Sequence, residues 1–296
     1  MMIEKESTLI TFVPKSKQCI VTNVRNLESR KLVIPELENI GSLSEELNSL
    51  CLLNDNRAFC YSTRINGEQP GQIFIIDYVN RNIERRPDSQ RISYGARGIF
   101  YQETDSVYIF GGVLSKSAFK YSLRSENWTE LSSMEAESHT CSCALFGDNI
   151  VYSGYLHTNL YIYSISNDCH YAFRSSEEYP SIPNLTQNSA KIVTVNSNRI
   201  FIIDALGFIY ESHECSASEW TILAKSRINY GYLMSYIFPY NKSIYFVIQN
   251  ALYEFCFGTN IGDKRVRLKI QDISKIEENS IENDKKEKEE EDKRIN

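Results

Sequence analysis

The stretch that decides the fold of this chain is "DSVYIFGGVLSKSAFKYSLRSENWTEL", residues 105–131. An alternating apolar run ends in the doublet Gly111–Gly112, a second alternating run carries Tyr121, and Trp128 follows seven residues after Tyr121. Runs of this length and alternation predict β-strands, because successive side chains of a strand point to opposite faces. The fold then depends on whether the stretch is a single hairpin or one copy of a repeat.

The second half of the stretch, residues 118–131, recurs along the chain. Three other segments align with it without a gap: 19–32, 73–86 and 160–173. The residues that fall at the positions of Tyr121 and Trp128 are Thr22 and Ser29, Ile76 and Ile83, and Tyr163 and His170. Looser copies at 207–220 and 251–258 carry Tyr210, with Trp220 three residues late, and Phe255.

Another alternating run precedes each copy, and five of these six runs follow a short polar turn and a further apolar run. The repeating unit is therefore four strands, named a, b, c and d in chain order, and only the first unit lacks strand a. Four antiparallel strands that recur every 42–54 residues predict the blades of a β-propeller. We expect an all-β, six-bladed propeller over residues 1–270, in which each blade covers a face of its neighbour.

Residues 271–296 differ sharply from the rest, with ten acidic and six basic residues and little apolar content. This composition predicts a charged C-terminal tail that is disordered or a solvated helix. Within it, "DISKI" at 272–276 is the one candidate for the missing strand a of the first unit, which would close the ring from the C-terminus. The alternatives are that the ring closes imperfectly or that the chain is part of a longer product.

The repeat resembles the kelch motif, through Gly111–Gly112, Tyr121, Trp128 and the following Met134. The resemblance implies that the glycines let the chain turn after strand b and that the aromatic rings pack between blades. Other units keep only part of the motif. The residues assigned this structural role are Gly111, Gly112, Tyr121, Trp128, Gly154, Tyr163, Tyr210 and Trp220.

The connections between strands divide into two sets on opposite faces of the predicted ring. The a–b and c–d turns on one face are short, whereas the b–c and d–a loops on the other face include the long connections. Kelch propellers usually bind a protein or peptide through such loops, and long loops on a rigid scaffold suit recognition. The predicted protein contacts are Arg64, Tyr94, Arg97, Tyr155, His157, Arg227 and Tyr230; the alternative is that each is an ordinary solvent-exposed loop residue.

The sequence contains no pattern that predicts catalysis or a cofactor. His139, Cys141 and Cys143 alternate on one strand and could share a face as metal ligands, but small cysteines also suit crowded packing at the centre of a propeller. No G-x-S-x-G or phosphate-binding loop occurs. We therefore predict no enzyme, no metal and no cofactor. The alternative is a propeller enzyme that acts on a small polar metabolite in the central channel.

Composition sets the remaining expectations. The net charge is −6, and with the tail set aside the body is nearly neutral, which predicts no general attraction to nucleic acid. No apolar run is long enough to span a membrane, and the N-terminus does not resemble a signal peptide. The eight cysteines include no C-x-x-C pair and are expected to be reduced. These features predict a cytoplasmic, monomeric protein-binding scaffold.

Overall fold

The structure of the chain, a computed structural model, describes residues 8–12, 18–23, 28–33, 50–54, 56–62, 71–89, 92–93, 95–112, 115–137, 139–155, 160–172, 191–195, 199–203, 208–212, 221–225, 234–240, 243–248, 251–257 and 271–272. Within these residues, strands and turns are joined by a single short 3-10 helix, Gln102–Thr104. This part of the chain contains no helix long and apolar enough to cross a membrane. The described protein is therefore all-β, in agreement with the prediction.

The strands form six antiparallel sheets, each built from consecutive strands of the chain. The first sheet has three strands and each of the other five has four. The first three sheets contain β1 (Thr8–Phe12), β2 (Gln18–Asn23) and β3 (Glu28–Val33); β4 (Leu50–Leu52), β5 (Arg57–Ser62), β6 (Gly71–Asp77) and β7 (Asn82–Ser89); and β8 (Arg97–Tyr101), β9 (Ser106–Phe110), β10 (Ala118–Ser122) and β11 (Trp128–Glu130).

The last three sheets repeat the same order of strands. Their strands are β12 (His139–Phe146), β13 (Asn149–Tyr155), β14 (Tyr161–Ser164) and β15 (Cys169–Ala172); β16 (Lys191–Val195), β17 (Arg199–Ile203), β18 (Phe208–Ser212) and β19 (Thr221–Lys225); and β20 (Met234–Tyr240), β21 (Ser243–Ile248), β22 (Ala251–Cys256) and β23 (Gln271–Asp272). Five repeats of a four-stranded antiparallel sheet are compatible with propeller blades.

The repeat alignment corresponds to a physical register between strands c and d. Tyr121 pairs directly with Trp128. The gapless copies pair in the same way, which confirms the alignment: Thr22 with Ser29, Ile76 with Ile83, and Tyr163 with His170. In the fifth sheet the ladder shifts after Ile209, and Tyr210 pairs with Ile222, whereas Trp220 lies outside the described residues.

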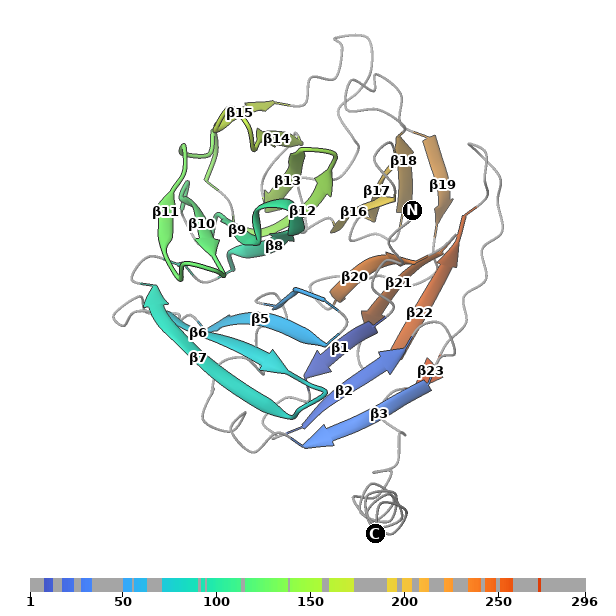
Figure 1. Ribbon diagram of the computed structural model, residues 1–296. Coiled ribbons are helices and arrows are strands. Elements are labelled where there is room, and N and C mark those ends of the chain that lie inside the picture. The colour runs from blue at the N-terminus through green and yellow to red at the C-terminus, as the bar shows by residue number, and fades with distance from the viewer. Residues whose placement is uncertain are drawn as a thin grey trace, which may run out of the picture.

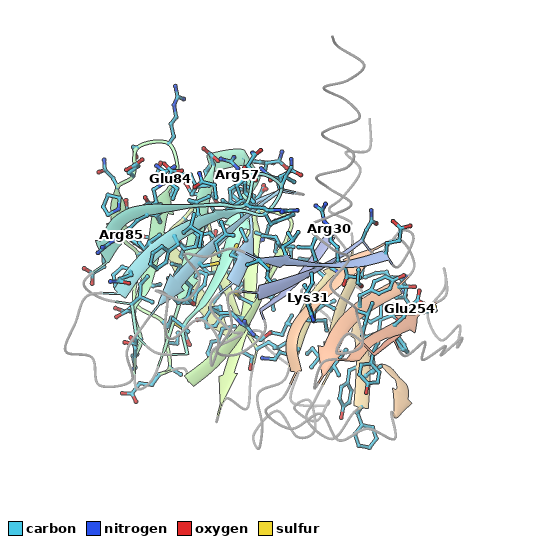
Figure 2. All side chains as sticks on the ribbon, turned by 90° about the horizontal axis from the view of Figure 1, so that it is seen from below. Arg30, Lys31, Arg57, Glu84, Arg85 and Glu254 are labelled. Atoms are coloured by element: carbon cyan, nitrogen blue, oxygen red, sulfur yellow. The ribbon has the colours of Figure 1, made fainter. Side chains whose placement is uncertain are left out.

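The first strand of each four-stranded sheet lies toward the middle of the molecule, and we call β4, β8, β12, β16 and β20 the inner strands (Figure 1). Successive inner strands approach one another closely: Cα atoms of β4 and β8, of β8 and β12, of β12 and β16, and of β16 and β20 lie within 8 Å. The sheets thus follow one another in chain order around a shared middle. Both Figure 1 and Figure 2 show the first sheet beside the sixth.

Each pair of successive sheets encloses its own hydrophobic cluster. One cluster joins the first and second sheets through Cys19 and Cys60, and the other clusters join the second to the third, the third to the fourth, the fourth to the fifth and the fifth to the sixth. Strands β9 and β17 are consequently buried at every residue, because sheets cover them on both faces. The outer strands carry exposed charge, as Glu84 and Arg85 on β7 illustrate (Figure 2).

The C-terminal strand does not take the place that the sequence suggested for it. Asp272, the first residue of the candidate closing segment 272–276, pairs with Ala251 of β22. It therefore lies at the outer edge of the sixth sheet, and residues 273–276 lie outside the described part of the chain. The first sheet keeps β1 at its edge, with three strands in the order β1-β2-β3.

Candidate functional site

The best-described part of the predicted binding face surrounds the Gly111–Gly112 doublet that ends β9. Both glycines have positive φ, +72° and +115°. A Cβ added to Gly112 would lie 2.4 Å from the Cβ and 3.0 Å from the carbonyl oxygen of Ser93, which belongs to the connection between the second and third sheets. The doublet is therefore needed for conformation and for close approach, since a side chain at Gly112 would push this connection away.

Three connections of the chain are held together at this end of the third sheet. Gly111 N–H donates to the carbonyl of Ser117 at 2.9 Å, which closes the loop between β9 and β10. Met134 N–H donates to the carbonyl of Lys116 at 2.8 Å, and the Lys116 ammonium donates to the carbonyl of Glu135 at 3.1 Å. These bonds join the loop after β11 to the loop after β9. Gly112 in turn lies against Ser93 in the connection before β8.

We call the described parts of these connections, residues 92–93, 95–96, 111–112, 115–117 and 131–137, the loop platform. Its exposed polar side chains are those of Lys116, Ser133, Glu135 and Glu137. The platform places both signs of charge on a backbone fixed by hydrogen bonds, which is a geometry suited to recognition.

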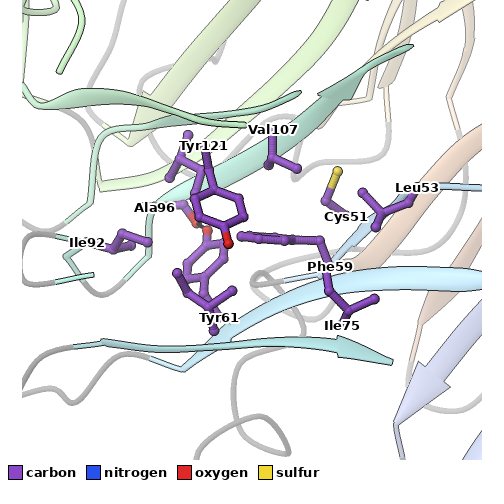
Figure 3. Packing of buried hydrophobic residues seen from close by; sticks show 11 residues of the cluster. Cys51, Leu53, Phe59, Tyr61, Ile75, Ile92, Ala96, Val107 and Tyr121 are labelled. Carbon is purple, nitrogen blue, oxygen red and sulfur yellow. Dashed lines mark hydrogen bonds between the residues drawn. The ribbon is translucent and has the colours of Figure 1, made fainter. Parts of the chain in front are cut away.

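Below the platform, Tyr121 and Trp128 lie between the second and third sheets. Tyr121 is fully buried, and its ring centroid lies 4.8 Å from that of Trp128 and 5.5 Å from that of Phe59. Figure 3 shows Tyr121 beside Phe59, with Tyr61 and Ala96 close by. Trp128 is half-buried and meets Phe119 edge-on. The two rings therefore fill the space between neighbouring sheets.

The predicted contact residues fall into three groups. Arg97, the first residue of β8, is only 8% exposed, so its surroundings differ from those of an open loop residue. Tyr155 ends β13 and pairs with His139, and nothing further is described for its side chain. Arg64, Tyr94, His157, Arg227 and Tyr230 lie outside the described residues.

His170 occupies in the fourth sheet the position that Trp128 occupies in the third. Its ring centroid lies 4.8 Å from that of Tyr163 at an angle of 44°, nearly the geometry of Tyr121 and Trp128, 4.8 Å and 46°. Unlike an indole, the imidazole makes two hydrogen bonds: Nε2 meets the carbonyl of Ser132 at 2.8 Å and Nδ1 meets the Tyr152 hydroxyl at 2.9 Å. Because a carbonyl only accepts, Nε2 carries the proton and Tyr152 donates to Nδ1.

Asp168 completes this link between the loop platform and the fourth sheet. Its Oδ1 accepts the Ser132 N–H at 2.9 Å and the Tyr163 hydroxyl at 3.0 Å. The Ser132 N–H is the main cause that lowers the pKa of Asp168. Burial lowers the pKa of His170 below 6.5. The Ser132 carbonyl, Asp168 and Glu135 raise this pKa, but their effect is smaller than that of burial. Alignment of the repeated segments placed His170 opposite Tyr163 correctly, but it did not indicate these polar partners.

Because burial favours the neutral form of His170, we expect the folded protein to lose stability in mild acid. Because its pKa is lower in the folded than in the unfolded protein, its contribution is present above about pH 6.5 and is lost as the pH falls toward the folded pKa. We expect urea unfolding midpoints of the wild type to fall from pH 7 to pH 5 more steeply than those of His170→Phe, which keeps a ring but does not titrate. The Asp168 carboxylate takes up a proton only below about pH 4, so its effect on stability lies outside this pH range. Parallel slopes for the two proteins between pH 7 and pH 5 would contradict this assignment.

A buried ion pair that the sequence did not indicate lies where the fifth and sixth sheets meet. Arg199 Nε donates to Glu211 Oε1 at 2.6 Å, and Arg199 Nη2 forms an ion pair with the same oxygen. The guanidinium carbon lies 5.2 Å from the ring centroid of Phe201 and 4.7 Å from that of Phe257. Both charged residues are buried, so this pair lies inside the protein and not on a binding surface.

The described residues contain no group of three or more His, Cys, Asp or Glu side chains arranged to hold a metal ion. Of the three candidate ligands in the "HTCSC" segment, His139, Cys141 and Cys143, only Cys143 has a described side chain, and it is half-buried. The six cysteines with described side chains are free thiols, and burial raises the pKa of Cys19 to about 12. The buried thiols therefore act as small apolar packing residues.

No family model matches the chain. No curated protein matches it either.

Proposed function

We propose that this chain is a six-bladed propeller of kelch type that acts, without catalysis, as a protein-interaction scaffold. Each described sheet would be one blade, and the inner strands would line the central axis. Two findings support the ring: clusters join successive sheets from the first to the sixth, and successive inner strands approach within 8 Å. The Tyr121–Trp128 pair supports the kelch resemblance, because it fills a gap between sheets.

The observation that carries the binding function is the loop platform. Its three connections are distant in sequence and are joined at one end of the third sheet by backbone bonds and by Gly112. A surface fixed in this way loses little entropy when a partner binds, because its backbone is already ordered. Its exposed lysine and glutamates would meet polar groups at the rim of an interface with a protein or peptide.

The test is a matched pair of surface variants, one on each face. Lys116→Glu reverses a charge on the loop platform, and Arg124→Glu reverses a charge in the exposed turn between β10 and β11, at the opposite end of the same sheet. A partner captured with the wild type and identified by mass spectrometry would be purified, and its Kd would be measured with each variant. We expect Lys116→Glu to weaken binding about tenfold, which is about 1.4 kcal/mol, and Arg124→Glu to change it less than twofold.

The two variants also separate surface recognition from folding. Both substituted residues are exposed, so Arg124→Glu should unfold at the wild-type temperature. Lys116→Glu also removes the hydrogen bond to the Glu135 carbonyl, and its cost in stability should stay below about 1 kcal/mol. Equal Kd values for all three proteins, or weakening by Arg124→Glu alone, would place the binding surface elsewhere and would overturn the proposed role of the platform.

A further inference from the structure

Ser132 of the loop platform is held by the fourth sheet through both of its backbone polar groups. Its N–H donates to Asp168 Oδ1 at 2.9 Å, and its carbonyl accepts the Nε2–H of His170 at 2.8 Å. Asp168 ends the turn before β15 and His170 lies on β15, and β11 and β15 are the outer strands of neighbouring sheets (Figure 1). These two bonds therefore fix the start of the connection 131–137, where it leaves β11.

The same connection is held to the third sheet by a separate set of bonds. Leu131 N–H donates to the carbonyl of Ala118 at 2.9 Å, and Met134 N–H donates to the carbonyl of Lys116 at 2.8 Å. Residues 131–134 thus bridge two sheets. The bonds to the third sheet join backbone groups, whereas the bonds to the fourth sheet end on an imidazole and a carboxylate, so the second side is the one that responds to pH.

The contacts of His170 suit its neutral ring. The Tyr152 hydroxyl of β13 donates to Nδ1 at 2.9 Å, the Tyr163 ring of β14 lies 4.8 Å away between centroids, and Phe110 of β9 meets the ring edge-on at 6.2 Å. A proton on Nδ1 would place two donors face to face, so the Tyr152 hydroxyl would have to turn round and accept. The remaining contacts are apolar and cannot stabilise a charge.

Two carboxylates of the described residues act on this ring. Asp168 in the turn before β15 and Glu135 on the loop platform both favour its protonated form, but burial outweighs them and keeps the pKa of His170 below 6.5. A ring released into water would titrate at about pH 6.5. Because the released ring binds a proton more readily than the held ring, the held state is favoured above this pH and is lost as the pH falls toward the lower pKa.

We propose that His170 is a pH-sensitive latch, which holds the connection 131–137 of the loop platform at neutral pH and releases it in mild acid. On release, the Ser132 carbonyl loses its donor, and the connection keeps only its bonds to the third sheet. A partner would then bind more weakly, because this part of the platform would have to be ordered again on binding. That regulatory consequence rests on the proposed function of the platform, whereas the latch itself requires no partner.

The experiment measures amide hydrogen exchange by NMR in the wild type without a partner, at pH 7 and pH 5.5, with each rate corrected for its intrinsic pH dependence. We expect the protection of Ser132 and Met134 to fall by at least about threefold between these pH values. Gly111 is the internal control, because its N–H bonds to Ser117 elsewhere on the platform, and its protection should change by less than about 1.5-fold. The fall should share its midpoint with the titration of the His170 ring.

Two variants hold the latch in one state. His170→Gln supplies an amide N–H that reaches the Ser132 carbonyl and does not titrate, so Ser132 should stay protected at both pH values. His170→Phe keeps a ring but offers no donor, so Ser132 should be less protected at pH 7 than in the wild type and should change little at pH 5.5. With the captured partner, the Kd of the wild type should rise about threefold more than that of His170→Gln over the same range.

The exchange measurement separates the latch from the function of the platform. Unchanged protection of Ser132 in the wild type while the His170 ring titrates would overturn the latch, and so would the same pH dependence in the wild type and both folded variants. If exchange responds as expected but Lys116→Glu leaves partner binding unchanged, the latch stands and the proposed function fails. If Lys116→Glu weakens binding but exchange does not respond to pH, only the latch fails.

Discussion

Replacing Glu211 with alanine is expected to destabilise the protein by about 3 to 5 kcal/mol, the usual cost of removing one partner of a buried ion pair. The Arg199 guanidinium, packed against the Phe201 and Phe257 rings, would lose the carboxylate that now accepts its Nε at 2.6 Å. Neither side chain could turn to water without opening the contact between the fifth and sixth sheets. Urea unfolding of Glu211→Ala, followed by circular dichroism, measures this loss.

A double variant separates the value of the pair from the penalty for breaking it. Arg199→Met with Glu211→Leu removes both charges and keeps apolar volume, and we expect it to recover most of the stability that Glu211→Ala loses. Glu84→Ala, which removes an exposed partner of Arg86, is the surface control and should cost less than about 1 kcal/mol. If Glu211→Ala were no more costly than Glu84→Ala, the Arg199–Glu211 pair would not hold the two sheets together.

Trp128→Ala is expected to cost about 3 kcal/mol, near the lower end of the range for removing a large ring from a core. The lower end applies because Trp128 is half-buried, whereas Tyr121 beside it is fully buried. The substitution would leave a void between the second and third sheets, where the indole now contacts Tyr121 and Phe119. Denaturant unfolding followed by circular dichroism would measure the cost without relying on tryptophan fluorescence.

Val79→Ala provides the comparison, since Val79 is 50% exposed in a turn of the second sheet and its truncation should change stability by less than about 0.5 kcal/mol. Binding to the partner by the fraction of Trp128→Ala that remains folded should be unchanged. A fully stable Trp128→Ala that no longer binds would show that the ring is a contact residue and not a packing residue.

The sequence alone determined the strands and their order within the first five sheets, and the first three strands of the sixth. Alternation specifies which residues face a neighbouring sheet, and a short hairpin specifies which residues of strands c and d are opposite one another. Both properties are local, so Tyr121–Trp128 and Tyr163–His170 could be recognised as equivalent pairs from their spacing. The Gly111–Gly112 doublet was likewise visible, because a positive φ limits the choice of residue.

Only the tertiary structure decided which polar and charged residues are buried and what they contact. Arg97 was predicted as a contact residue on the loop face, yet the surrounding sheets leave it 8% exposed. The contacts of Arg199 with Phe257, of His170 with Ser132, and of Gly112 with Ser93 each join segments from different sheets. Such contacts depend on how sheets pack and have no period in the sequence. For the same reason Asp272 could be recognised as part of a short apolar segment, but its place at the edge of the sixth sheet could not.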